Sequence, residues 1–154
     1  MNGRGGAPEP GHASSSGGVQ PRMAPLILVA DDDPDIRRVL RGLLEPLAEV
    51  EEAADGAQAL ERLRAAKPRL LLLDVVMPEM NGIAVLQAAR VFAPDLPVLM
   101  LTGESDLAMA QLALESGARA YITKPFEPER LLDEVRRLLD PSEAPSSRPW
   151  RVRR

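Results

Sequence analysis

Short apolar runs alternate with longer segments of helical period along most of this chain. Five apolar runs have the length of strands, and the first, third and fourth lack polar alternation, which is typical of parallel strands covered on both faces. Each run is followed by a segment whose apolar residues recur at helical spacing. The predicted strands cover residues 26–30, 50–53, 70–73, 98–101 and 120–122.

The predicted helices start and stop at residues that suit helix termini. Asp33 precedes Pro34, which combines a capping carboxylate with a first-turn proline, and Asp55 and Asn81 suit the starts of two further helices. Gly117 suits a left-handed residue at a helix end. The helices cover residues 34–45, 56–66, 82–92, 105–116 and 128–139. Repeated strand–helix units without a long loop predict an α/β domain with a doubly wound, five-stranded parallel sheet and five helices.

The two ends of the chain differ in composition from its middle. Residues 1–22 are Gly, Ser, Pro and Ala with almost no large apolar side chain, so we expect a disordered leader. Residues 141–154 should form a flexible basic tail, in which Trp150 among arginines also suits an acidic partner or RNA. The folded domain is expected over residues 23–140. Translation from Met23 would remove the leader and leave this domain whole.

Composition limits the chemistry that the domain can perform. The chain has 154 residues, a formal net charge of −4, no cysteine and a single histidine, His12. Disulfides, thiolate metal sites, histidine-based zinc sites and catalytic triads are excluded, so any metal must be held by oxygen. The charge argues against direct DNA binding, and no apolar run is long enough for a membrane span or a secretory signal. A cytoplasmic location is therefore expected.

Polar residues follow the predicted strands at the points where the apolar runs end. Asp31 and Asp32 follow the first strand, Asp74 the third and Thr102 the fourth, and Lys124 comes shortly after the fifth. In a doubly wound sheet these residues share one edge, beyond which ligands bind. Carboxylates, a hydroxyl and an ammonium group are the groups that hold Mg²⁺ together with a phosphoryl group. The sequence therefore predicts a phosphoryl site at this edge.

Four separated stretches carry a resemblance to a known family. They read "LVADDD", "LLLLDVVMPEMNG", "PVLMLTGES" and "GARAYITKPF". In these motifs and their order, the chain resembles the receiver domains of two-component response regulators over about residues 25–139. The resemblance implies a flavodoxin-like fold with strand order 2-1-3-4-5. It also implies a phosphoacceptor, Asp74, that receives its phosphoryl group from a histidine kinase or a histidine phosphotransfer protein.

The same resemblance assigns a Mg²⁺ site to the acidic residues. Asp32 and Asp74 would bind the ion together with the backbone carbonyl of Val76, and Asp31 would act mainly through a bound water. Val76 stands where some members of the family carry a polar side chain beside the phosphoryl group, which leaves the phosphoryl lifetime open. Mg²⁺ should be obligatory, because it lowers the cost of bringing an anionic donor to a carboxylate nucleophile.

The remaining site residues are expected to contact the phosphoryl group or to transmit its presence. The resemblance implies that Thr102 and Lys124 contact phosphoryl oxygens and that Tyr121 is the rotating aromatic of a switch. Tyr121 is also compatible with a simple core aromatic. The bond between Lys124 and Pro125 is a candidate cis peptide, which in the family aims the lysine into the site.

The predicted helix over residues 105–116 is too apolar for a single buried stripe. Its helical wheel places Leu107 and Leu114 on one side, flanking Gln111. We expect this side to be exposed as a surface for a downstream protein target or for a phosphorylation-dependent homodimer. The residues expected to face the sheet lie on the opposite side of the helix: Met109, Leu112 and Ala113.

Three functions remain open from the sequence. The favoured one is a stand-alone response regulator, similar to the chemotaxis regulators, which acts through protein contacts and is not an enzyme in the usual sense. The chain is also compatible with a receiver module of a longer protein. A Mg²⁺-dependent aspartyl-phosphate phosphohydrolase ranks lower, because haloacid-dehalogenase-type enzymes carry an acid two residues after the nucleophile, where this chain has Val76.

Overall fold

The computed structural model of the chain describes residues 24–140. The expected leader, Met23 and the expected tail lie outside the described residues. The strands are β1 (Leu26–Ala30), β2 (Glu49–Ala53), β3 (Leu70–Asp74), β4 (Val98–Gly103) and β5 (Ala120–Lys124). The helices are α1 (Pro34–Leu44), α2 (Gly56–Ala66), α3 (Gly82–Phe92), the 3₁₀ turn η2 (Glu104–Asp106), α4 (Leu107–Glu115) and α5 (Pro128–Leu139).

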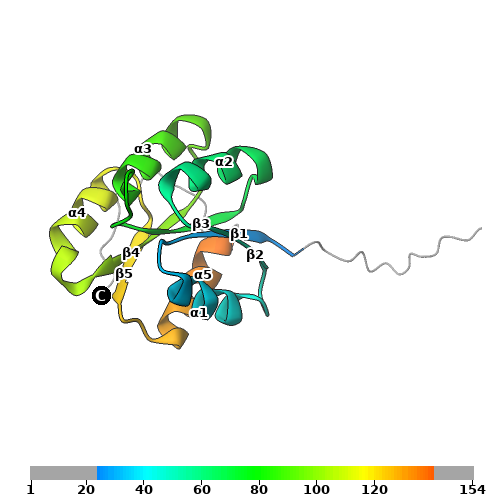
Figure 1. The fold of residues 1–154 in the computed structure, drawn as a ribbon. Helices are drawn as coiled ribbons and strands as arrows, with labels where there is room; N and C mark the ends of the chain where they lie inside the picture. Colours follow the sequence, from blue (N-terminus) through cyan, green and yellow to red (C-terminus); the bar gives the residue numbers. More distant parts are fainter. Residues whose placement is uncertain (1–23, 141–154) are drawn as a thin grey trace, which may run out of the picture.

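The strands form one parallel sheet in the order β2-β1-β3-β4-β5, which confirms the predicted topology. Helices α1 and α5 cover one face of the sheet, and α2, α3 and α4 cover the other (Figure 1). A parallel sheet needs this double cover because both of its faces are apolar. No helix within residues 24–140 has the length and apolar character that a membrane span requires.

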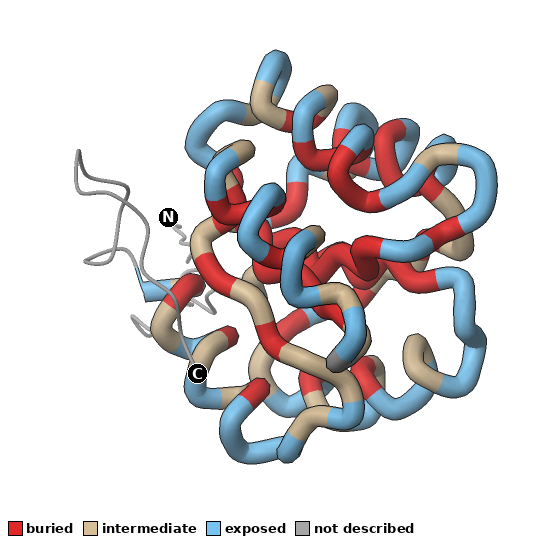
Figure 2. The backbone as a smooth tube through the Cα atoms, turned by 90° about the vertical axis from the view of Figure 1, so that its left-hand side faces the viewer, coloured by how far each residue is buried: buried red, intermediate tan, exposed pale blue. Residues whose placement is uncertain are grey.

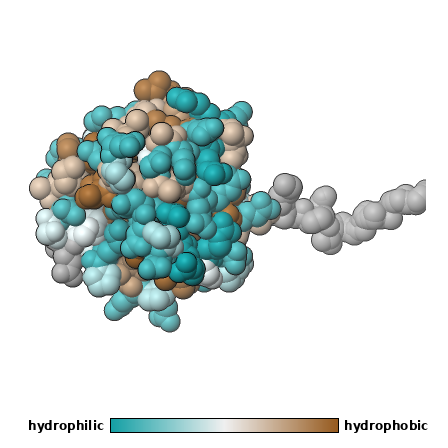
Figure 3. Space-filling model, in the orientation of Figure 1, coloured by the Kyte–Doolittle hydropathy of each residue, from teal (hydrophilic) through white to brown (hydrophobic). Residues whose placement is uncertain are grey.

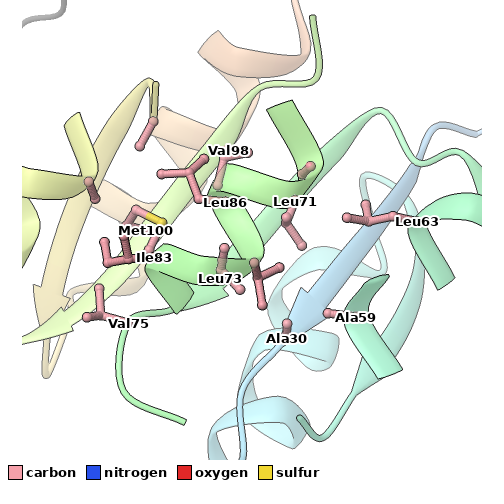
Figure 4. Packing of buried hydrophobic residues seen from close by; sticks show 14 of the residues in the cluster. Ala30, Ala59, Leu63, Leu71, Leu73, Val75, Ile83, Leu86, Val98 and Met100 are labelled. Carbon is pink, nitrogen blue, oxygen red and sulfur yellow. The ribbon is translucent and has the colours of Figure 1, made fainter. Parts of the chain in front are cut away.

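Two apolar clusters, one on each face of the sheet, form the core. Successive residues of a strand point to opposite faces, so Leu71 and Leu73 pack on one side while Leu70 and Leu72 pack on the other. Figure 4 shows the first cluster, where strand side chains face those of α2 and α3. The buried segments run through the middle of the molecule, and the outer faces of the helices are exposed (Figure 2).

The capping residues predicted from the sequence are in place. The side chains of Asp33, Asp55 and Asn81 accept hydrogen bonds from backbone N–H groups at the starts of α1, α2 and α3. Gly117 has a φ of 114°, as expected for a left-handed residue after α4. These local signals fix where the helices begin and end, and thereby where the loops at the edge of the sheet leave the strands.

Three strands extend further at their carboxyl ends than their apolar runs suggested. β3 includes Asp74, β4 continues through Thr102 to Gly103, and β5 ends at Lys124. The pairing continues across these polar residues, with Thr102 opposite Thr123 and Gly103 opposite Lys124. Asp74, Thr102 and Lys124 are therefore held by the backbone ladder of the sheet, whereas Asp31 and Asp32 lie in the loop directly after β1.

The orientation predicted for the helix over residues 105–116 is wrong in part. The segment begins as the 3₁₀ turn η2, and in α4 the buried stripe contains Ala110, Ala113 and Leu114. Leu114 is 2% exposed and packs in the core, whereas Leu112 is 42% exposed. Ala110 belongs to the buried stripe, but its small side chain gives only a weak hydrophobic signal in the sequence. The predicted partner surface loses Leu114.

Candidate functional site: an acidic cluster with a lysine

Three carboxylates lie together beyond the carboxyl ends of β1 and β3. One carboxylate oxygen each from Asp31, Asp32 and Asp74 lies within 4.8 Å of the other two. Asp31 and Asp74 are buried and Asp32 is exposed. Like charges at this separation repel and favour protonation or a cation between them. The sequence predicted the residues of this cluster, and the parallel sheet explains why they meet.

Every polar group of Asp31 is occupied by the protein. Its N–H donates to the carbonyl of Ala53 (3.1 Å), and its carbonyl accepts from Arg37 Nη1 (2.7 Å). Its Oδ1 accepts from the N–H of Asp33 (2.9 Å), and its Oδ2 lies 3.2 Å from Lys124 Nζ. The carboxylate of Asp32 forms no hydrogen bond or ion pair within residues 24–140. The exposed Asp32 is therefore the carboxylate that is free to bind a ligand directly.

Asp74 occupies the last position of β3 and is 4% exposed. Its Oδ1 lies 3.3 Å from Lys124 Nζ and accepts a long hydrogen bond from the N–H of Val76 (3.4 Å). Burial and the neighbouring Asp31 raise the pKa of Asp74 to about 7, and Lys124 opposes this shift. The metal-free cluster therefore holds one carboxyl that protonates near neutral pH.

Lys124 ends β5 and lies between the two buried carboxylates. Burial by itself lowers the pKa of Lys124, but Asp31 and Asp74 outweigh this effect and leave the pKa above its ordinary value. The ammonium group is therefore charged at neutral pH. The peptide bond from Lys124 to Pro125 is cis, as the sequence analysis proposed.

The hydroxyl of Thr102 is buried and makes no hydrogen bond within the described part of the chain. A buried donor without a partner costs free energy, so such a group in a native fold calls for an explanation. The position of Thr102 at the end of β4, next to the strand that ends at Asp74, makes a ligand of the cluster the obvious partner. Tyr121 is half-buried and packs against the core cluster of Figure 4, and its role in a switch stays a prediction.

The loop that follows Asp74 is packed tightly against the site. The N–H of Gly82 donates to the carbonyl of Val75 (2.8 Å). A Cβ atom on Gly82 would lie 2.2 Å from the carbonyl oxygen of Asp74, which no side chain tolerates. Glycine at this position therefore allows the two backbone segments to approach closely. The side chain of Val76 is 58% exposed at the rim.

The donor set fits a hard divalent cation. Asp31, Asp32 and Asp74 together outnumber the single ammonium of Lys124, so the ionised cluster keeps excess negative charge. All available ligand atoms are oxygens, which Mg²⁺ prefers. The unpartnered hydroxyl of Thr102 adds a donor for an anion beside the cation. The arrangement can hold a cation and a phosphoryl group together.

Sequence reasoning missed one pair of residues near the cluster. Arg37, which contacts the carbonyl of Asp31, also donates through Nε to Glu52 on the edge strand β2 (2.9 Å). The two residues lie fifteen positions apart, and a pairing between a helix and a strand leaves no periodic signal in a single sequence.

The fold and the cluster together define a doubly wound α/β domain with an acidic site at the carboxyl edge of its sheet. A family model for the response regulator receiver domain matches residues 27–136. The chain therefore belongs to the response regulator receiver domain family, as the resemblance implied. Receiver domains are the signalling domains of two-component systems, and an acidic Mg²⁺ site is typical of the family.

The names of two proteins with similar sequences agree with this assignment. The chain is 42% identical over 121 residues to the "Probable transcriptional regulator ycf27" of Cyanophora paradoxa, and the match covers 78% of this chain and 50% of that protein. It is 41% identical over 115 residues to the "DNA-binding response regulator MtrA" of Mycolicibacterium smegmatis, with 74% and 50% coverage.

Solved structures give the same fold. The receiver domain of NtrX from Brucella abortus superimposes with a TM-score of 0.71 at 35% identity, covering 73% of this chain and 97% of that chain. A CheY-like receiver domain protein from Methanospirillum hungatei gives a TM-score of 0.73 at 34% identity, covering 78% and 97%.

The chain spans about half the length of the curated relatives that it matches. One of them is described as DNA-binding, which qualifies the expectation that this chain has no direct contact with DNA. The comparisons therefore support a response regulator receiver domain and leave the output of the whole protein as a matter for proposal.

Proposed function

We propose that Asp74 accepts a phosphoryl group from a histidine kinase or a histidine phosphotransfer protein in a Mg²⁺-dependent reaction. One observation carries this proposal. The carboxylate of Asp74 is buried against Lys124 Nζ (3.3 Å) and lies within 4.8 Å of Asp31 and Asp32 carboxylate oxygens, beyond the strand ends of a receiver fold.

Each residue of the cluster has a role that follows from its surroundings. Asp32, Asp74 and the backbone carbonyl of Val76 would hold the cation, with Asp31 acting through a water because its own groups are already occupied. When bound, Mg²⁺ supplies positive charge that lets an anionic donor approach a carboxylate. Asp74 must be ionised to act as the nucleophile, so displacement of its proton accompanies loading of the site.

The transfer replaces the bond between phosphorus and the donor nitrogen by a bond between phosphorus and Asp74. A carboxylate oxygen of Asp74 forms a bond to phosphorus, the bond from phosphorus to the donor nitrogen breaks, and its electron pair stays on the imidazole. Lys124 stabilises the charge on the transferred oxygens, and the buried hydroxyl of Thr102 donates a hydrogen bond to one of them. This contact would satisfy the one unpartnered hydroxyl of the site.

We further propose that the described domain acts by changing its contacts with a downstream protein or with a second copy of itself, in the cytoplasm. Drawing Thr102 toward the phosphoryl group and rotating Tyr121 would favour one of two pre-existing states. The proposed contact surface contains Leu107, Gln111 and Leu112, which are the exposed residues of α4 that support it. This mode of action is compatible both with a stand-alone regulator and with a receiver module of a longer protein.

The test is phosphorylation by acetyl phosphate with and without Mg²⁺, followed by intact mass. The wild-type chain is expected to gain a single phosphoryl group only when Mg²⁺ is present. Asp74→Asn should lose the label, because the amide is not an anionic nucleophile. Asp33→Asn is the matched control, because Asp33 is exposed and asparagine also caps helices. An unlabelled wild type, or full labelling of Asp74→Asn, would contradict the proposal.

A further inference from the structure

Arg37 connects the edge of the sheet to the acidic cluster. It lies in the first turns of α1, and its side chain is 17% exposed. Its Nη1 donates to the carbonyl oxygen of Asp31 (2.7 Å), and its Nε donates to Glu52 Oε1 on β2 (2.9 Å). One guanidinium group therefore bridges a backbone carbonyl at the site and a carboxylate on the edge strand.

We infer that Arg37 is a positioning residue that sets the Mg²⁺ affinity of the cluster through the peptide unit between Asp31 and Asp32. The carbonyl of Asp31 and the Cα atom of Asp32 belong to the same planar peptide group. Fixing that carbonyl therefore fixes the direction in which Asp32 leaves the backbone. The inference rests on the proposed role of Asp32 as a direct Mg²⁺ ligand.

The edge strand holds Asp31 at both of its peptide units, directly through the N–H group and by way of Arg37 through the carbonyl. The N–H of Asp31 donates to the carbonyl of Ala53, the last residue of β2, and Glu52 is the residue before it. Glu52 is itself fixed by a second arginine, Arg41, whose Nε lies 2.6 Å from Oε2. Hydrogen bonds from Arg41 and Arg37 lower the pKa of Glu52, so this anchor stays ionised at neutral pH. Arg37 is thus held by an anchor before any ligand arrives.

Positioning and simple electrostatics predict opposite effects when Arg37 is replaced. Arg37 is a cation close to a site for a cation, so its removal strengthens Mg²⁺ binding if charge alone matters. If Arg37 instead orients the peptide of Asp31 and Asp32, its removal weakens binding, because the ligand must then be ordered when the ion binds. The sign of the change separates the two explanations.

The experiment measures Mg²⁺ affinity of the full chain by isothermal titration calorimetry, with urea unfolding of the same samples. Arg37→Gln is expected to weaken Mg²⁺ binding by about tenfold, the lower end of the range for lost outer-shell partners. Arg37→Lys keeps the charge but cannot bridge two acceptors with a rigid fork, and should weaken binding several-fold. Glu52→Gln should also weaken it, because Arg37 loses its anchor.

Arg41→Gln is the matched control. It removes a cation from the same helix and a contact to the same glutamate, but Arg41 has no contact with Asp31. Its Mg²⁺ affinity should equal or slightly exceed that of the wild type, while its urea midpoint falls. A purely structural role for Arg37 would lower the urea midpoint of both arginine variants and leave Mg²⁺ affinity unchanged in both.

A second measurement does not need the metal. Amide hydrogen exchange at Asp33, whose N–H donates to Asp31 Oδ1, should be faster in metal-free Arg37→Gln than in Arg41→Gln. Mg²⁺ binding by Arg37→Gln or Arg37→Lys as tight as that of the wild type would overturn the inference while the proposed function stands. A wild-type chain that binds no Mg²⁺ would contradict both the inference and the proposed function.

Discussion

The two ends of the sheet differ in how their charged groups are used. At the carboxyl end, Asp31 and Asp74 are buried and share one lysine, Lys124. At the amino end, the loops before β3 and β4 line a cavity of about 740 Å³. Apolar and charged residues both line it: Leu63, Pro68, Phe92, Ala93, Pro94, Leu96 and Pro97 with Arg64, Lys67, Arg69 and Asp95.

The functional groups lie at the carboxyl end of the sheet and not around this cavity. None of Arg64, Lys67 and Arg69 forms an ion pair within residues 24–140, although Arg64 lies over the ring of Phe92, 5.2 Å from its centroid. The carboxyl end instead combines a raised pKa with an unpartnered hydroxyl, and such groups mark functional sites.

Hydrophobic side chains also reach the surface near the amino end. Val91 is 82% exposed and Phe92 is 39% exposed at the end of α3. The space-filling view shows a mainly hydrophilic face with hydrophobic residues scattered toward its upper and left margins (Figure 3). Isolated exposed apolar residues are normal and define no site by themselves. Substitutions at the two ends of the sheet should therefore differ in their effects on stability and on phosphorylation.

The largest effect is expected for Gly82→Ala at the carboxyl end. The added Cβ meets the Asp74 carbonyl oxygen at 2.2 Å, so the loop must move, at a cost of about 3 kcal/mol in unfolding free energy. Phosphorylation by acetyl phosphate should be lost with it. The control is Gly117→Ala at the amino end, which is strained by its φ of 114° and should cost about 1 kcal/mol while phosphorylation persists. Equal losses of labelling in the two variants would contradict the comparison.

Asp74→Asn is expected to stabilise the metal-free chain. The folded-state pKa of Asp74 is about 7, above its ordinary value of 3.8, so the folded state binds the proton more tightly than the unfolded state. The stability from this group is complete below the unfolded value and is lost as pH rises through about 7. Asparagine does not ionise, so the variant should have a higher unfolding free energy than the wild type, by on the order of 2 kcal/mol at pH 8.

The measurement is urea unfolding in EDTA at pH 5 and pH 8. The gain of Asp74→Asn over the wild type should grow with pH, and added Mg²⁺ should reverse the ranking by stabilising only the wild type. Asp33→Asn, which changes an exposed carboxylate outside the cluster, should show no pH-dependent gain. A gain that is the same at both pH values would show that the raised pKa of Asp74 plays no part.

The sequence predicted the parts of the molecule that carry a local or periodic signal. The continuous run Leu70–Leu73 is typical of a strand covered on both faces, and Asp33 and Asn81 have the side chains that cap helices. The site followed because parallel strands bring their carboxyl ends together. Side-chain partnership between distant elements has no such signal, which is why Arg37 and its edge-strand partner were missed.

The prediction of which side of α4 is buried was wrong in part for a related reason. The helix is apolar almost all round, so its wheel does not select one face. The choice between Leu112 and Leu114 is made by what α4 packs against, and Leu114 lies in the core cluster with Ala113 and Ala118. Tertiary contacts therefore decide the cases in which the pattern is nearly uniform.

Phe92→Ala tests the amino end with a smaller effect. The substitution removes a partly buried ring and its contact with Arg64, and should lower the unfolding free energy by about 1 kcal/mol. Mg²⁺ affinity and labelling by acetyl phosphate should match the wild type, because the cavity lies at the opposite end of the sheet from the cluster. A change in either would mean that the two ends are coupled.

The smallest effects are expected at two residues with positive φ, one at each end. Lys67 ends α2 at the amino end with a φ of 52°, and Glu79 has a φ of 70° in the loop after Asp74. The N–H of Met80 donates to the carbonyl of Pro78 (2.7 Å), so Glu79 is the centre of a strained three-residue turn.

Glycine relieves the strain at both positions but also gives the unfolded chain more freedom. Lys67→Gly should gain about 0.5 kcal/mol, because a left-handed residue at a helix end is mild, and Glu79→Gly about 1 kcal/mol, because its turn is rarer. Urea unfolding measures both gains, with Mg²⁺ titration alongside. Loosening the loop that carries Val76 should weaken Mg²⁺ binding only in Glu79→Gly, since the carbonyl of Val76 is a proposed ligand. If Lys67→Gly weakened it equally, the strain at Glu79 would have no connection to the site.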